Sequence, residues 1–161
     1  MSKKQNPEIP QKLIDALIRT VIEQGFSPGI DAITERACVS KMTAYAQFTS
    51  RTGLTVAALE RVGREVRKGL EQATRQSGCE SSRDFRRVTD CLVQQLTDRD
   101  NPLAFITSCL LGHPDPRSRI HAAARKEHAA IADWLESYCK SSRTLNPQKA
   151  ANAAIALIHG T

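Results

Sequence analysis

The chain has 161 residues, of which 40% are hydrophobic and 25% charged, and its formal net charge is +6. This length can bury a core in one domain or two small ones, and this composition excludes a disordered chain. No apolar run approaches the roughly 20 residues that span a bilayer, and the five widely spaced cysteines include no C-x-x-C pair. We therefore expect a cytoplasmic protein with free thiols and no membrane partner.

A wide apolar stripe runs through residues 8–24 and predicts an amphipathic helix. Pro10 fits its first turn, where backbone N–H groups have no partner within the helix, and Gly25 follows its end. The stripe consists of Ile9, Leu13, Ile14, Leu17, Ile18, Val21 and Ile22.

Residues 25–51 predict two short helices around a tight turn, followed by the start of a longer helix. The first short helix has one apolar face and ends near Ala37. In the turn, Val39 should point into the core and Ser40 should cap the second short helix, residues 41–48. The apolar face of the first short helix consists of Ile30, Ile33 and Ala37.

The second short helix can turn Ala44 and Phe48 inward. Its other side chains then point outward, and a helix-turn-helix places such a helix end-on in the DNA major groove. The outward residues are Lys41, Met42, Thr43, Tyr45 and Gln47.

The stretch IDAITERACVSKMTAYAQFTSRTGL resembles the DNA-binding signature of the TetR/AcrR family of repressors. The matching positions are Gly25, Phe26, Ile33, Ala37, Val39, Ser40, Lys41, Thr43, Tyr45, Phe48, Ser50 and Leu54. The resemblance implies an all-α protein with an N-terminal three-helix, helix-turn-helix DNA-binding domain over residues 1–50. A long helix would join it to an α-helical ligand-binding and dimerisation domain over residues 51–161.

Several positions depart from the family pattern. Cys38 stands where glycine is usual, at a position that often favours positive φ. Pro28 and Gly29 replace the hydroxyl residues that cap the first short helix, so one expected phosphate contact is missing. Met42 replaces a glycine and Gln47 a histidine, so the surface that reads the bases is this protein's own.

The resemblance assigns phosphate contacts to Tyr45 and Arg51, and Ser40 and Thr43 can donate hydroxyls nearby. A glutamine side chain can hydrogen-bond to the edge of adenine and a lysine to that of guanine, and a methyl or thioether group can pack on a thymine methyl. The candidates to reach base edges are Lys41, Met42, Thr43 and Gln47. The implied partners are double-stranded operator DNA and a second copy of the chain. The first 70 residues also hold the larger share of the positive charge, with 11 basic and 7 acidic side chains against 12 and 10 in the rest.

A long helix is predicted over residues 51–76, with Ser50 as its N-cap. We interpret its basic residues beyond Arg51 as a solvated face rather than as DNA contacts. They are Arg61, Arg64, Arg67 and Lys68.

Every later segment also has a helical pattern, and no strand pattern or repeat occurs. The predicted helices span residues 85–96, 103–111, 117–140 and 148–159, with linkers at 77–82 and 141–147 and a stiff loop at 112–116. Family members commonly continue for one more helix. The resemblance therefore leaves a truncated product and a differently built dimer as alternatives.

The resemblance also implies a pocket for a small-molecule effector among the later helices. Core packing is the simpler explanation of each candidate, because apolar residues at helical spacing need no ligand. The candidates are Phe85, Phe105, Cys109, His121, Trp134 and Tyr138.

We expect neither a metal nor another cofactor. His121 and His128 are seven residues apart, too far to share one ion, and the chain has no HExxH motif or cysteine cluster. It also has no phosphate-cradling glycine-rich loop, no GxSxG and no catalytic Cys/His signature, so we expect no enzyme. We expect Cys109 and Cys139 to be inert core thiols, with oxidant sensing by one of them as the alternative.

The resulting expectation is a sequence-specific transcriptional regulator, most simply a dimeric repressor on a near-palindromic operator, released by a small-molecule effector. The alternative is a helical interaction protein, or a truncated relative that dimerises without specific DNA binding.

Overall fold

The structure, a computed structural model, describes residues 8–25, 28–75, 90, 102–113 and 115–141. Within these residues every regular element is an α-helix. The helices are α1 (Glu8–Gln24), α2 (Ile30–Ala37), α3 (Lys41–Gln47), α4 (Arg51–Arg75), α6 (Pro102–Leu111) and α7 (Arg119–Ser141). Of the helix predicted over residues 85–96 the described residues include Asp90, which is helical. The helix predicted over residues 148–159 and the linker predicted at 77–82 lie outside the described residues. The linker predicted at 141–147 begins within α7, which includes Ser141.

The predicted helix bounds are correct to within two residues, and the small errors have local causes. The helix predicted over residues 117–140 begins at Arg119, because the Ser118 hydroxyl accepts the backbone N–H of His121 at 3.1 Å and caps the helix. α3 ends at Gln47, because Phe48 adopts an extended conformation. α6 begins one residue early, at Pro102, since proline is favourable at the first helical position.

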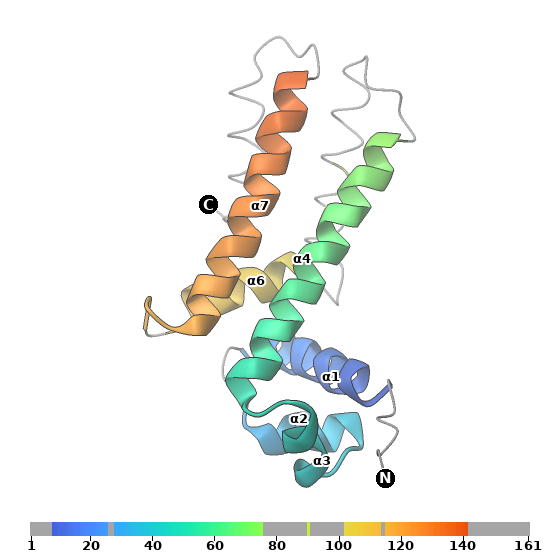
Figure 1. Cartoon of the computed structure of the whole chain (residues 1–161), viewed down its shortest axis with the longest axis vertical. Coiled ribbons are helices and arrows are strands. Elements are labelled where there is room, and N and C mark those ends of the chain that lie inside the picture. The colour runs from blue at the N-terminus through green and yellow to red at the C-terminus, as the bar shows by residue number, and fades with distance from the viewer. Residues whose placement is uncertain (1–7, 26–27, 76–89, 91–101, 114, 142–161) are drawn as a thin grey trace.

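The described helices form two groups. In Figure 1, α1, α2 and α3 gather at one end, while α4 leads away from them and runs beside α7. α6 packs on α4 and α7 and also reaches α1. One hydrophobic cluster therefore runs from Leu17 and Ile33, beside the short helices, to Ile131 and Leu135 on α7. α4 and α6 both join the three-helix end to the rest of the described residues.

The basic residues of α4 divide into two groups. Arg64 and Lys68 are exposed, as predicted. For Arg61 and Arg67 the prediction of a solvated face was wrong, because both are half-buried and form ion pairs. α4 lies between α1 and α7, so some of its polar positions face a neighbouring helix instead of water.

None of the helices in the described part of the chain is long and apolar enough to cross a membrane.

Candidate nucleic-acid interface

The turn between α2 and α3 is closed by two backbone hydrogen bonds. The N–H of Cys38 donates to the Glu35 carbonyl at 3.1 Å, and the N–H of Val39 donates to the Thr34 carbonyl at 3.0 Å. This is the Schellman pattern, which requires a left-handed residue after the helix. Cys38 has φ 53° and ψ 43°, so it adopts the conformation for which glycine is usual. The structure confirms the sequence prediction that a less permissive residue takes this position.

The hydroxyls of Ser40 and Thr43 begin α3. Ser40 Oγ accepts the Thr43 backbone N–H at 3.1 Å, which confirms the predicted N-cap, and it lies 2.8 Å from Thr43 Oγ1. Val39 packs against the hydrophobic cluster, also as predicted. Because one hydroxyl of the pair donates to the other, one hydroxyl proton remains for a further acceptor.

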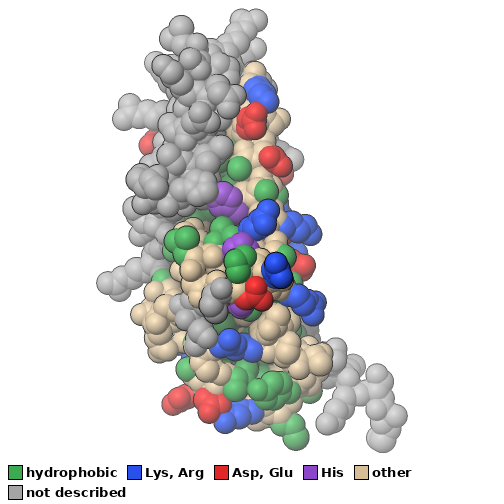
Figure 2. All heavy atoms as spheres, turned by 90° about the vertical axis from the view of Figure 1, so that its left-hand side faces the viewer, with side chains coloured by type: hydrophobic (Ala, Val, Ile, Leu, Met, Phe, Trp, Pro, Cys, Tyr) green, Lys and Arg blue, Asp and Glu red, His purple; other side chains and the backbone are tan. Residues whose placement is uncertain are grey.

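α3 exposes side chains that folded proteins usually cover. Met42 is 82% exposed and Tyr45 50% exposed, whereas Ala44 is buried against the core. Gln47 is half-buried at the end of the helix. At the end of the molecule where Figure 1 places α2 and α3, Figure 2 shows exposed hydrophobic side chains beside basic and acidic ones. The surface is therefore mixed in character rather than uniformly basic.

Lys41 is paired with a carboxylate that the sequence analysis did not identify. Its ammonium nitrogen lies 2.6 Å from Oδ1 of Asp31, in the first turn of α2, and both side chains are largely exposed. An exposed pair of this kind contributes little to stability. It does hold the Lys41 cation at the start of α3. No helical spacing rule connects residues on two different helices, so the sequence carries no signal for it.

Arg51 has a role within the fold. It is half-buried at the start of α4, and its Nη1 donates to the Pro28 carbonyl at 3.0 Å. Gly29, the N-cap of α2, provides no side-chain cap, as its departure from the family pattern predicted. The predicted N-cap at Ser50 is confirmed, because its hydroxyl accepts the Gly53 N–H at 3.1 Å. Arg51 therefore fixes the loop before α2 to the first turn of α4.

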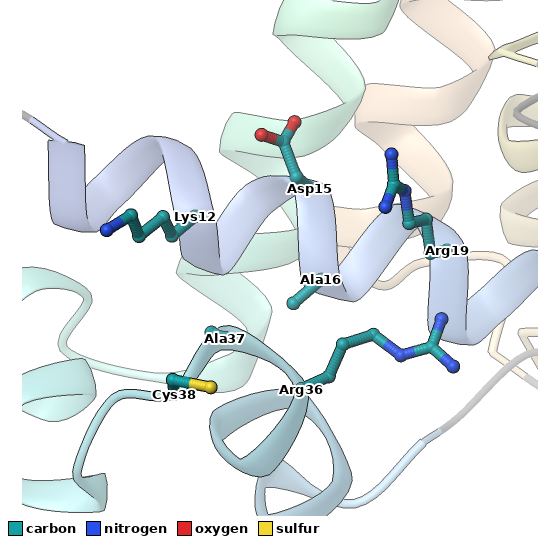
Figure 3. Close-up of a pocket in the computed structure, with 7 residues that line it drawn as sticks. All are labelled: Lys12, Asp15, Ala16, Arg19, Arg36, Ala37 and Cys38. Atoms are coloured by element: carbon teal, nitrogen blue, oxygen red, sulfur yellow. The ribbon is translucent and has the colours of Figure 1, made fainter.

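Ion pairs also join α1 to its neighbours around a cavity of about 330 Å³ between α1 and the end of α2 (Figure 3). Arg36 binds Glu23 of α1; this hydrogen bond lowers the pKa of Glu23 and raises that of Arg36. Asp15 lies 2.8 Å from the Arg61 guanidinium of α4. The cavity is lined by Lys12, Asp15, Ala16, Arg19, Arg36, Ala37 and Cys38. These pairs fix α1 to both α2 and α4.

The effector-pocket candidates lie in or beside the core. Phe105 and Cys109 of α6 are fully buried, and the rings of Trp134 and Tyr138 stack on α7 with centroids 5.5 Å apart. His121 is half-buried in the first turn of α7, and Phe85 lies outside the described residues. Burial raises the pKa of the Cys109 thiol to about 12, so this thiol stays protonated and unreactive at neutral pH. Packing explains these positions, and an effector pocket remains a prediction.

The sequence matches no protein-family model and has no significant match among the curated proteins. Solved structures do match it. A TetR-family transcriptional regulator from Agrobacterium tumefaciens has a TM-score of 0.78 at 16% identity, over 96% of this chain and 86% of the other.

Two structures from Streptomyces are also similar to the chain. A protein of Streptomyces avermitilis assigned to the TetR regulators has a TM-score of 0.75 at 21% identity, over 97% of this chain and 84% of its own. A TetR-family regulator from Streptomyces coelicolor has a TM-score of 0.73 at 19% identity, over 95% of this chain and 93% of its own. Together with the all-helical architecture and the helix-turn-helix at one end, these similarities show that the protein has the fold of the TetR-family transcriptional regulators.

Proposed function

We propose that the protein is a sequence-specific DNA-binding transcriptional regulator that reads DNA with α3. The observation that carries the proposal is the exposure of Met42 and Tyr45 on a short helix that is capped and held at one end of the molecule. Large side chains in such a position call for a partner. A helix presented end-on after a tight turn fits the major groove.

The side chains of α3 divide into two proposed roles. Tyr45 and the hydroxyls of Ser40 and Thr43 contact phosphates, which fixes the register of the protein on the duplex. Lys41, Met42 and Gln47 contact base edges, with Thr43 at the boundary between the two groups. Arg51 contacts a phosphate as well as the Pro28 carbonyl, because a guanidinium has five N–H donors.

The finer part of the proposal follows the resemblance. Residues 1–50 form the DNA-binding domain and residues 51–161 the regulatory and dimerisation domain of a cytoplasmic homodimer. The dimer represses by binding two half-sites about one helical turn of DNA apart. A small molecule in the larger domain releases it by binding more tightly to the form that does not fit the operator.

The test is binding of the purified protein to a pool of genomic fragments at two salt concentrations, with sequencing of the retained DNA. One palindromic motif with affinity that falls steeply as salt rises is the expected result. Retention without a motif would contradict sequence-specific recognition. It would favour instead a helical protein that dimerises or binds a protein partner, which gel filtration would then examine.

A further inference from the structure

The buried face of α7 contains one acidic residue. Ala124 and Ile131 are fully buried, and Glu127, three residues after one and four before the other, lies on the same face and is only 4% exposed. A carboxylate in such a place is strongly unfavourable unless a cation or several hydrogen bonds satisfy it. The structure must therefore supply a partner from a neighbouring helix.

The partner is Arg67 of α4. Its Nη1 donates to Glu127 Oε2 at 2.6 Å, and its side chain is 27% exposed. The guanidinium therefore reaches from the surface to the carboxylate at the contact between α4 and α7. Charge-assisted hydrogen bonds of this length are the strong ones, and they depend on geometry.

Gly63 makes room for the carboxylate. It lies four residues before Arg67, on the same face of α4. A Cβ atom at position 63 would lie 1.9 Å from Glu127 Oε2 and 2.7 Å from its Cδ. Glycine is unfavourable inside a helix, yet any larger residue here would push the carboxylate away from Arg67. The three residues therefore form one contact, which we call the α4–α7 latch: Gly63, Arg67 and Glu127.

α4 also contacts the DNA-binding end. Arg61 pairs with Asp15 of α1 at 2.8 Å, and Arg51 bonds the Pro28 carbonyl before α2. A change at the latch would therefore move α1, α2 and α3 together with α4 instead of bending the chain between them.

We propose that Arg67 and Glu127 are positioning residues: the α4–α7 latch sets the angle between α4 and α7 and thereby the distance between the two recognition helices of a dimer. This inference rests on the proposed function. About 12 residues of α4 separate the latch from Arg51, or roughly 18 Å of helix. A rotation of about 5° over that length moves α3 by about 1.6 Å, and by about twice as much between two subunits. That is close to the rise of roughly 3.4 Å per base pair.

The experiment compares operators whose half-sites are separated by the selected spacing and by one or two base pairs more or fewer. It measures affinities for the wild type, Glu127→Gln, Arg67→Gln and the double variant. Arg64→Gln is the matched control, since it removes the same charge from an exposed position of α4. Arg67→Lys tests rescue, because it keeps a cation near the carboxylate.

Wild type, Arg64→Gln and Arg67→Lys should share one optimal spacing. Glu127→Gln and Arg67→Gln should lose about 10-fold in affinity at that spacing, about 1.4 kcal/mol. They should bind operators of the other spacings almost as well as the operator of the selected spacing. The double variant should be no worse than either single one, because both break the same contact. If the variants are less stable but retain the wild-type spacing preference, the latch only stabilises the fold and the proposal is overturned.

A second measurement needs no DNA. Spin-labelled amino acids at positions 12 and 126, exposed on α1 and α7, report the distance between these helices within one subunit when labelled chains are diluted with unlabelled ones. Glu127→Gln and Gly63→Ala should broaden or shift the distance distribution. An unchanged distribution in both would overturn the positioning role even if the wild type binds its operator. A wild type that selects no motif would instead remove the proposed function, and this distance would still decide whether the latch positions α1.

Discussion

α3 and α7 depart from an ordinary amphipathic helix in opposite ways. α3 exposes Met42 and Tyr45, which such a helix would cover, whereas α7 buries Glu127, which such a helix would leave in water. The buried carboxylate has its partner within the chain, in Arg67. The exposed side chains of α3 would find theirs outside it, and this contrast separates a residue that positions a helix from residues that meet a ligand.

The largest expected effect concerns two thiols, Cys38 in the turn before α3 and Cys109 on α6, which packs against α7. Cys38 is exposed beside the cavity of Figure 3, and Cys109 is fully buried. If Cys109 becomes accessible only on unfolding, a stability of about 5 kcal/mol makes its alkylation at least about 1,000-fold slower than that of Cys38. Peptide mapping after timed alkylation of the native protein measures both rates. Comparable rates would show that α6 opens easily and is not part of a tight core.

The burial of the Cys109 thiol should also make the stability of the protein depend on pH. The folded-state pKa of Cys109 is raised to about 12 from 9.0, so the burial of this thiol stabilises the protein below pH 9, and that contribution is lost as pH rises toward 12. The stability advantage of the wild type over Cys109→Ala in urea unfolding should therefore be the same at pH 7 and pH 8 and should fall above pH 9. An advantage that does not fall above pH 9 would mean that the thiol is not held in an apolar environment.

Arg67→Met should destabilise the fold more than the truncation of an exposed side chain on α3. It leaves the Glu127 carboxylate buried without its cation, which for a fully buried pair costs about 3–5 kcal/mol. Because Arg67 is partly exposed, we expect roughly 2–3 kcal/mol. Urea unfolding measures the difference. Arg64→Met, the control on the same helix, should stay within about 0.5 kcal/mol of the wild type, and equal losses in the two variants would exclude a special contact.

Met42→Ala and Tyr45→Phe should separate specificity from affinity. Tyr45→Phe removes one hydrogen bond to a phosphate and should weaken binding to the operator and to unrelated DNA alike, by about 10-fold. Met42→Ala should weaken binding to the operator only. Neither should change stability by more than about 0.5 kcal/mol, since both side chains are exposed. Fluorescence anisotropy with the operator and with an unrelated duplex measures both affinities. An equal loss of affinity for the two duplexes in Met42→Ala would show that Met42 does not recognise bases.

The smallest predicted effect tests the turn that holds α3. Cys38→Gly relieves a left-handed conformation at an exposed residue and should stabilise the protein by about 1 kcal/mol, raising Tm by about 2–4 °C. Cys38→Ala keeps the Cβ atom and should give no such gain. Calorimetry of the two variants makes the comparison, and equal Tm values would mean that the turn is not strained.

Features set by residues three or four apart were predictable from the sequence. The caps at Ser40 and Ser50 and the end of α2 at Ala37 depend on such local spacing, and the structure confirms them. The unusual turn at Cys38, which the structure also confirms, was implied by the resemblance to the family. The family motif added the all-α fold. Its assignment of DNA contacts to α3 stays a prediction.

Contacts between residues distant in the chain were not predictable. Arg51 and Pro28 are 23 residues apart and Arg67 and Glu127 are 60 apart, so no spacing rule joins them. Glu127 did carry one signal, because it occupies a position in the apolar stripe of α7 between Ala124 and Ile131. An acidic residue at such a position indicates a buried partner without saying on which helix.

The most direct test of the central claim, that α3 reads DNA in the major groove, is protection of guanine N7 from methylation on the selected fragments. That atom is exposed only in the major groove. We predict two protected clusters about one helical turn apart, both lost in a variant that combines Met42→Ala with Gln47→Ala. Binding that leaves every guanine N7 reactive, or protection that the variant retains, would contradict recognition by α3.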